Sequence, residues 1–365
     1  FRQNERGNWD EVLQRVAETL HSEFPGIPAD GRELSRQEKK QQSSKRLVER
    51  TSLEQRAVFL ANQGKYREAE LIYREMIAVG TTNHAVYTNL AVICGMQGRS
   101  DELIGLLNKS LELEPSSPET HYNLGKALEE HGDLSAAISS YRKVLELKPC
   151  FPGAHSNLGN ALKAQGELDA AIVSFRKALE LTPNCPDAHN NLGNALQERG
   201  SLDAAIVSFG KALGLNPHYH EVHYNLGNAL REQGNLRAAI TSYGKALELK
   251  PSCPEAHSNL GNVLVEYGDL SAAISSYKKA LEFKPQCPEV RSNLSMAELL
   301  IGDYKRGWER YEWRLRTKAG QVMLNAQPRC AQWSGEDLTS NDELLLVSEQ
   351  GLGDTLQFMR YALAL

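Results

Sequence analysis

The chain has 365 residues and a formal net charge of −5, from 41 basic and 46 acidic side chains. This balance excludes the strongly basic surface typical of nucleic-acid-binding proteins, so no nucleic-acid partner is expected. Hydrophobic residues make up 41 % of the chain, which is enough to build a buried core. No apolar run approaches the roughly 20 residues that cross a bilayer, so no membrane span is expected either.

The cysteines indicate free thiols rather than a metal site or a disulfide framework. None of the six lies in the C-x-x-C spacing typical of zinc sites, so no metal site is expected. Cys185, Cys253 and Cys287 share one position of a sequence repeat, and Cys150 lies one residue earlier in its own repeat. Cys94 and Cys330 complete the set. Free thiols are typical of a reducing compartment, so a cytoplasmic location is predicted.

The N-terminal region, residues 1–49, is predicted to be a helix followed by a polar linker. Residues 8–24 place Trp9, Val12, Val16 and Leu20 on one side of a helix. The first residue is Phe1, and the last residues form an apolar, helix-like run, so we expect both ends to continue in a longer reading frame.

A regular repeat dominates the sequence. Prolines recur at one constant spacing, at positions 115, 149, 183, 217, 251 and 285, and asparagines recur at the same spacing at 89, 123, 157, 191, 225, 259 and 293. Seven consecutive units fill residues 50–287, and a diverged unit follows over 288–320. Such repeats grow by stacking on their neighbours and need no single core.

One unit, residues 152–185, shows why each repeat is expected to be a pair of helices. Leu158 and Leu162 form an apolar stripe at i, i+4 on the first helix. Gly166 can adopt the left-handed conformation that ends it. The second helix carries a similar stripe, including Phe175, and Pro183 prevents its continuation.

The small residues, large residues and closing proline of these units resemble the tetratricopeptide repeat (TPR), over roughly residues 50–318. This resemblance implies an all-α fold, a right-handed superhelix or α-solenoid. It also implies that the inner face binds a protein or an extended peptide.

Asparagines on the first helix of the units, in pairs over residues 157–262, are the candidate peptide-binding residues. An amide offers one acceptor and two donors, so it can pair with both main-chain groups of a peptide. The candidates are Asn123, Asn157, Asn160, Asn191, Asn194, Asn225, Asn228, Asn259 and Asn262. They resemble the asparagine ladder of O-GlcNAc transferase-type superhelices. The alternative is that the first asparagine of each unit ties its helix to the neighbouring one. Two interpretations are also open for Tyr122 and Tyr224: their rings stack on a ligand, or they fill space between the helices.

The C-terminal residues change pattern. Trp308, Tyr311 and Trp313 are expected to seal the end of the stack. A linker over 321–342 precedes residues 343–365, which predict a strand, a glycine loop and a helix, the beginning of an α/β domain. Within the loop, Asp354 can cap the helix that follows.

Residues 343–365 resemble the opening of ADP-heptose-dependent glycosyltransferases of the GT-B type that follow TPR arrays in bacterial proteins. This resemblance implies that Asp354 is a catalytic base, that Gln350, Gly351 and Gly353 shape the loop, and that a longer protein uses a nucleotide-sugar donor. The chain itself is expected to hold no cofactor and to be inactive. Two functions stay open: a substrate-recognition arm for protein O-glycosylation, and a scaffold that only assembles partners.

Overall fold

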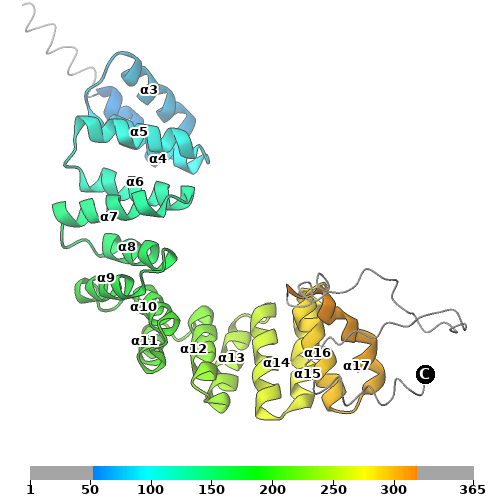
Figure 1. Cartoon of the computed structure of the whole chain (residues 1–365). Coiled ribbons are helices and arrows are strands. Elements are labelled where there is room, and N and C mark those ends of the chain that lie inside the picture. Colours follow the sequence, from blue (N-terminus) through cyan, green and yellow to red (C-terminus); the bar gives the residue numbers. More distant parts are fainter. Residues whose placement is uncertain (1–51, 319–365) are drawn as a thin grey trace, which may run out of the picture. The chain divides into compact units, whose positions relative to one another are not determined.

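The computed structural model describes residues 52–318, and this part of the chain is helical, with no strand in it. It belongs to two compact units, Phe1–Thr120 and His121–Leu365. The all-α repeat architecture predicted from the regular sequence repeat is confirmed for the described residues (Figure 1). No helix among them is long and apolar enough to cross a membrane. The predicted N-terminal helix and the strand–loop–helix of 343–365 lie outside the described residues.

In the first unit, a helix over 52–62 is followed by α3 (Tyr66–Ala78), α4 (His84–Met96) and α5 (Ser100–Leu113). Their apolar stripes meet in one core, in which Tyr73 and Leu90 are almost completely buried. Asn83 caps α4, because its side chain accepts a hydrogen bond from the backbone of Ala85.

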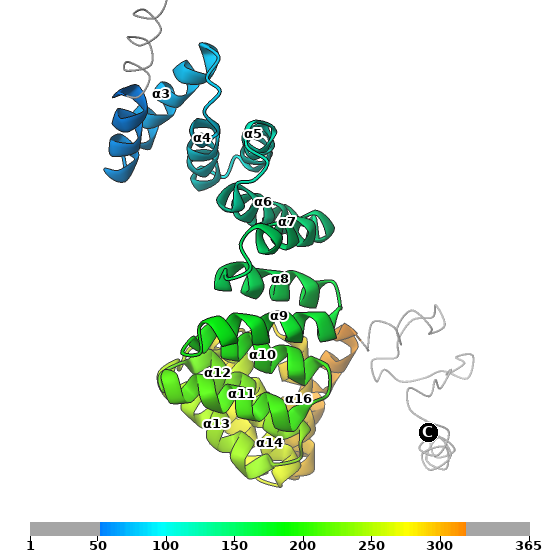
Figure 2. The ribbon, with the colours of Figure 1, turned by 90° about the vertical axis from the view of Figure 1, so that its left-hand side faces the viewer.

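The second unit alternates two kinds of helix, which we call A helices and B helices. The A helices are α6 (Pro118–His131), α8 (Pro152–Ala164), α10 (Pro186–Glu198), α12 (His220–Glu232), α14 (Pro254–Tyr267) and α16 (Pro288–Leu300). The B helices are α7 (Leu134–Leu147), α9 (Leu168–Leu181), α11 (Leu202–Leu215), α13 (Leu236–Leu249), α15 (Leu270–Phe283) and α17 (Tyr304–Tyr311). Figure 2 shows the same helices turned by 90°.

Local chemistry explains where these helices begin and end. Proline occupies the first turn of α8, α10, α14 and α16, where its missing N–H costs no hydrogen bond. A glycine with positive φ follows each A helix; Gly166, for example, has φ 87°. Asp133 and Asp269 cap α7 and α15 by accepting from backbone N–H groups.

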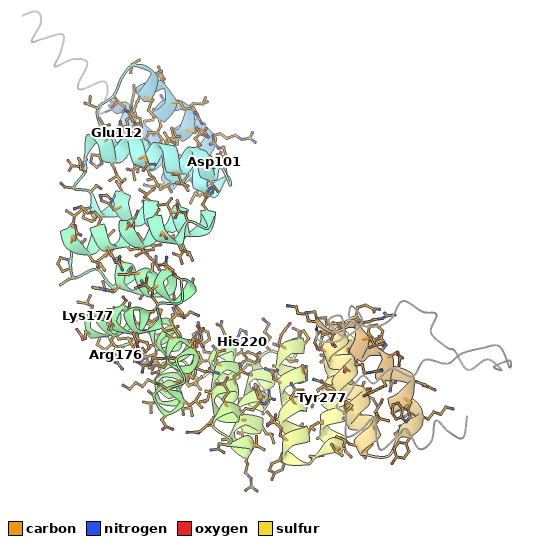
Figure 3. All side chains as sticks on the ribbon, in the orientation of Figure 1. Asp101, Glu112, Arg176, Lys177, His220 and Tyr277 are labelled. Carbon is orange, nitrogen blue, oxygen red and sulfur yellow. The ribbon has the colours of Figure 1, made fainter. Side chains whose placement is uncertain are left out.

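A glycine of each A helix from α6 to α14 packs against an aromatic ring of the B helix that follows. A Cβ built on Gly193 would lie 2.5 Å from the ring of Phe209, and one on Gly159 would lie 2.6 Å from that of Phe175. Tyrosine rings fill the same place in three other repeats, and Figure 3 labels one of them, Tyr277. Only glycine allows the two helices to approach this closely.

A second recurring contact joins A helices to the turn before them. The Nε2 atoms of His155, His189 and His257 lie 3.0, 3.0 and 2.9 Å from the carbonyl oxygens of the prolines six residues earlier. Arg291 makes the same contact in the last repeat, at 2.7 Å. These side chains therefore join each of these A helices to the turn that precedes it.

The C-terminal end of the stack differs from the internal repeats. α17 is only 8 residues long and continues as η1 (Glu312–Arg316). The guanidinium carbons of Arg291 and Arg316 lie 4.3 and 4.4 Å from the centroid of the Trp313 ring in η1. Trp308 is 59 % exposed, so its ring is not part of the core of the described residues. Ile274 occupies the same repeat position one unit earlier, and its side chain packs against the core that α14, α15 and α16 share.

We expect Gly193→Ala to lower the free energy of unfolding by about 1–3 kcal/mol, because its methyl group overlaps the Phe209 ring. Urea unfolding measures the change. Gly210→Ala is the matched control: a Cβ there meets nothing within 4 Å, so it stabilises by up to about 1 kcal/mol. Equal effects of the two variants would contradict the packing argument.

The thiols are expected to differ in reactivity. Cys94, Cys150, Cys185, Cys253 and Cys287 are all free, which agrees with the sequence interpretation, while Cys330 lies outside the described residues. Burial raises the pKa of the Cys94 thiol to about 11, whereas Cys150 is exposed. With Ellman's reagent on the native protein, Cys150 reacts quickly and Cys94 reacts only after unfolding. Peptide mass spectrometry assigns the sites, and fast labelling of Cys94 would contradict its burial.

Candidate peptide-binding face

The A helices of the second unit form its inner side. Consecutive A helices from α8 to α16 contact one another directly, whereas the B helices of the described repeats have no comparable contact. Two polar hollows of about 480 and 500 Å³ lie on this side, and both are lined by Gln197, Asn228 and Glu232. They therefore form one continuous groove across α8, α10, α12 and α14, which we call the helix-A groove. Of the predicted residues, Asn194, Asn225, Asn228 and Asn259 line it.

The first asparagine of the unit ties neighbouring A helices together in three repeats. Asn157 donates its amide N–H to the hydroxyl of Tyr122 at 3.1 Å. Asn225 donates to the Oδ1 of Asn190 at 3.0 Å, and Asn259 donates to the hydroxyl of Tyr224 at 3.0 Å. These three residues therefore make the helix-to-helix hydrogen bonds that the alternative interpretation predicts. Asn123 and Asn191 are half-buried and have no side-chain hydrogen bond within residues 52–318.

The second asparagines of the units fall into two groups, according to whether their side chains have a hydrogen-bond partner among the described residues. Asn228 accepts from the hydroxyl of Tyr243 at 2.6 Å, and its carbonyl also receives the Asn259 amide at 3.0 Å. Asn262 accepts from Tyr277 at 2.7 Å and from Asn293 at 3.0 Å. Burial raises the pKa of Tyr277 to about 12, so the phenol stays protonated and can donate.

Asn160 and Asn194 form the other group. In their repeats the ring at the position of Tyr243 and Tyr277 is Phe175 or Phe209, which carries no hydroxyl. Neither amide has a hydrogen-bond partner among the described residues, and both are only half-buried. These two amides therefore keep their donors and acceptor available. The sequence contains this signal, in the choice of Tyr or Phe at one position of the B helix.

Charged side chains bridge neighbouring repeats across the groove. Lys163 pairs with Glu198 at 3.0 Å, and Arg231 pairs with Glu266 at 2.6 Å. Gln197 donates to Glu232 at 2.6 Å. With Glu221 also in the lining, carboxylates outnumber cations in the groove. The groove therefore attracts cationic side chains more than anionic ones.

The groove face becomes apolar at α16. Met296 and Leu300 occupy the repeat positions of Asn262 and Glu266 one unit further on, and they are 46 % and 61 % exposed. Two exposed apolar side chains at i, i+4 form one patch on the helix.

Tyr122 and Tyr224 are packing residues. The Tyr122 ring meets that of Phe151 edge-on, with ring centroids 4.9 Å apart, and Tyr224 lies 5.9 Å from Tyr243. Their hydroxyls accept from Asn157 and Asn259 as described, so the packing alternative is confirmed for both.

The predicted catalytic residue Asp354 and the loop residues Gln350, Gly351 and Gly353 lie outside the described residues. Within 52–318, no group of three or more His, Cys, Asp or Glu side chains is placed to hold a metal ion.

Sequence families match the repeats. The family described as "TPR repeat" matches residues 129–166, 159–200, 193–230 and 227–268, and "Tetratricopeptide repeat" matches 106–139 and 254–287. Residues 106–287 are tetratricopeptide repeats. No curated protein matches the sequence.

Solved structures of TPR and related proteins resemble this TPR array in fold. The C-terminal part of a TPR repeat-containing protein from Cytophaga hutchinsonii has a TM-score of 0.55 and 20 % identity, over 66 % of this chain and 98 % of that one. PilF from Pseudomonas aeruginosa has a TM-score of 0.50 and 20 % identity, over 57 % and 97 %. The APC/C hetero-tetramer Cut9–Hcn1 has a TM-score of 0.51 and 17 % identity, over 88 % and 59 %.

The hydrogen bonds predict different effects for two asparagines of the TPR array. Asn259→Ala removes two contacts between A helices, so the free energy of unfolding should fall by about 1–2 kcal/mol. Asn194→Ala removes no hydrogen bond within the described residues, so it should change the free energy of unfolding by less than about 0.5 kcal/mol. Urea unfolding followed by circular dichroism compares them, and a larger loss for Asn194→Ala would refute the division.

Proposed function

We propose that the helix-A groove binds an extended peptide segment of a partner protein, chiefly through the peptide main chain. The observation that carries this proposal is the pair of unpartnered amides on neighbouring A helices: Asn194 lines the continuous polar groove, and Asn160 holds the same repeat position on α8. Packed helices lie about 8–10 Å apart, and an extended chain rises ~3.3 Å per residue. One amide therefore meets about every third peptide residue, and each can bind a peptide N–H and C=O together.

The lining of the groove indicates the composition of the peptide. The excess of carboxylates, among them Glu221 and Glu232, favours Lys or Arg side chains in the segment that crosses α10 and α12. Met296 and Leu300 favour an apolar side chain where the peptide reaches α16. The proposed partner segment is thus basic in its middle and apolar at one end.

A narrower role follows from the resemblance of residues 343–365 to a glycosyltransferase opening. In this proposal the TPR array holds the acceptor protein, a domain continuing from 343–365 uses a nucleotide-sugar donor, and Asp354 serves as the base. Its support is the sequence resemblance alone. It is tested by incubating a protein that includes the downstream sequence with nucleotide sugars and candidate acceptors, and absence of transfer favours the scaffold function.

The double variant Asn160→Ala/Asn194→Ala should weaken binding of a basic, extended probe peptide about tenfold, because two sets of main-chain hydrogen bonds are lost. Isothermal titration calorimetry on the full chain, with a peptide of alternating lysine and serine ending in two leucines, measures the affinity. Unfolding by urea should be unchanged, since neither amide holds another described residue.

Two further variants serve as controls for this measurement. Val173→Ala alters a side chain that is 56 % exposed on a B helix and should leave the affinity unchanged. Met296→Ser/Leu300→Ser should weaken the leucine-ended peptide but not an all-polar one. The groove proposal fails if the asparagine double variant binds as the unaltered protein does.

A further inference from the structure

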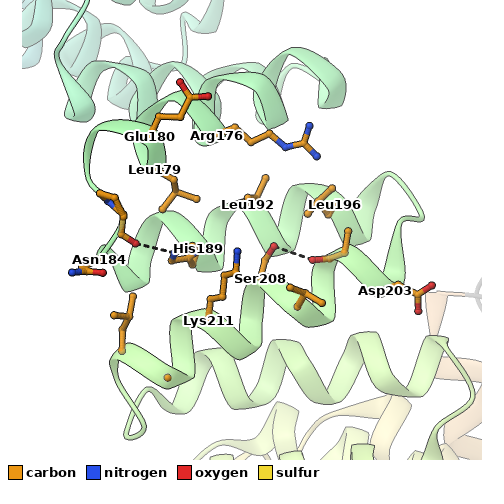
Figure 4. A pocket seen from close by; sticks show the side chains of 15 residues that line it. Arg176, Leu179, Glu180, Asn184, His189, Leu192, Leu196, Asp203, Ser208 and Lys211 are labelled. Atoms are coloured by element: carbon orange, nitrogen blue, oxygen red, sulfur yellow. Dashed lines mark hydrogen bonds between the residues drawn. The ribbon is translucent and has the colours of Figure 1, made fainter.

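The opposite side of the repeats carries a second groove that the sequence analysis did not predict. It has a volume of about 1010 Å³ and lies between the B helices α9 and α11, with α10 as its floor (Figure 4). Leu192 and Leu196 of α10 lie in the floor, and Leu179, Val207 and Leu215 line the walls. Val207 is 58 % and Leu215 41 % exposed, so these walls present apolar surface to solvent.

A glycine opens this groove at a position that is acidic in the neighbouring repeats. Gly214 lines it, and Glu180 and Glu248 occupy the equivalent positions of α9 and α13. A Cβ on Gly214 would meet nothing within 4 Å, so packing within the chain does not require glycine there. Glycine inside a helix lowers helix stability, and α11 carries a second one, Gly210, one turn earlier.

Glycine at position 214, where the neighbouring repeats have glutamate, also leaves one cation of the groove without an ion-pair partner in the described part. In α9 and α13, Lys177 and Lys245 pair with the glutamates three residues later, at 2.7 and 2.8 Å. Lys211 faces Gly214 instead and has no ion-pair partner within residues 52–318. Arg176, on the opposite wall, is also unpaired there.

The acidic groups of the lining are already engaged. Glu180 is paired with Lys177, and Asp203 accepts from the Gln233 amide at 2.6 Å. Lys211 and Arg176 therefore outnumber Asp203, the one carboxylate of the lining without a cationic partner in the described part, so the groove offers a net positive charge above an apolar floor. In addition, the Nδ1 of His189 is a buried atom without a hydrogen-bond partner in the described part, and this side chain is 9 % exposed.

We propose that this B-helix groove binds an amphipathic acidic helix of a partner protein. Helix-in-groove recognition places the apolar stripe of such a helix on a floor like that of Leu192 and Leu196. Its glutamate or aspartate side chains pair with Lys211 and Arg176 at the rim. The two walls are helices of 14 residues, about 21 Å long, so the groove accommodates about four turns.

The test uses a fluorescein-labelled 14-residue peptide with leucine at i, i+3, i+4 and i+7 and glutamate at the flanking positions. A twin peptide carries lysine in place of glutamate. Fluorescence anisotropy on the full chain should show the acidic peptide binding at least tenfold more tightly than its twin. Lys211→Glu should reverse this order, which a purely structural role of Lys211 would not do.

Gly214→Glu is the decisive variant. It restores the residue of the neighbouring repeats and its pair with Lys211, so the melting temperature should rise while acidic-peptide affinity falls at least tenfold. Gly244→Lys is the matched control: it removes a glycine of α13 that does not line the groove and should leave the affinity unchanged.

Three results would overturn the proposal: no measurable binding of the acidic peptide, equal binding of the two peptides, or unchanged affinity in Gly214→Glu. A loss of binding in Asn160→Ala/Asn194→Ala but not in Gly214→Glu would assign the peptide to the helix-A groove instead. This last comparison keeps the two sites distinguishable.

Discussion

The contact between a glycine and an aromatic ring sets the spacing of the two helices in every repeat of the second unit from α6 to α15. Because Gly193 and its equivalents have no side chain, the ring of Phe209 or of its tyrosine counterparts lies directly against the A-helix backbone. Each solenoid repeat stacks on its neighbours, so a change of this spacing in one repeat shifts the position of the repeats stacked beyond it. The positions of the groove residues on the A helices depend on this distance.

The sequence predicts well those features that depend on short-range sterics. Proline cannot continue a helix and glycine adopts positive φ without strain, so the bounds of α8 and the turn at Gly166 follow from residue type alone. The histidines that contact proline carbonyls also recur at one repeat position. These features recur at one spacing, which makes them visible in a single sequence.

Features that depend on side chains meeting across repeats were predicted less well. Whether Asn157 binds a ligand or its neighbour depends on Tyr122 in the preceding repeat, and only the three-dimensional stack brings them together. The groove at Gly214 arises from a missing side chain, which no apolar or charged motif reveals. Trp308 is exposed in the described part of the chain, which its residue type alone does not predict.

The same repeats thus present two chemically different surfaces, the helix-A groove and the B-helix groove. The aromatic residue in the core of each repeat affects the first of them, because it determines whether the nearby asparagine is engaged. A tyrosine such as Tyr277 engages the asparagine of its repeat, whereas Phe175 leaves Asn160 available, although both rings fill the same space. Phenylalanine and tyrosine codons differ by a single base. Mutation can therefore change how many amides a partner finds in the groove without altering any residue that the partner touches. Binding specificity in such an array can evolve from inside the protein, while the surface sequence stays the same.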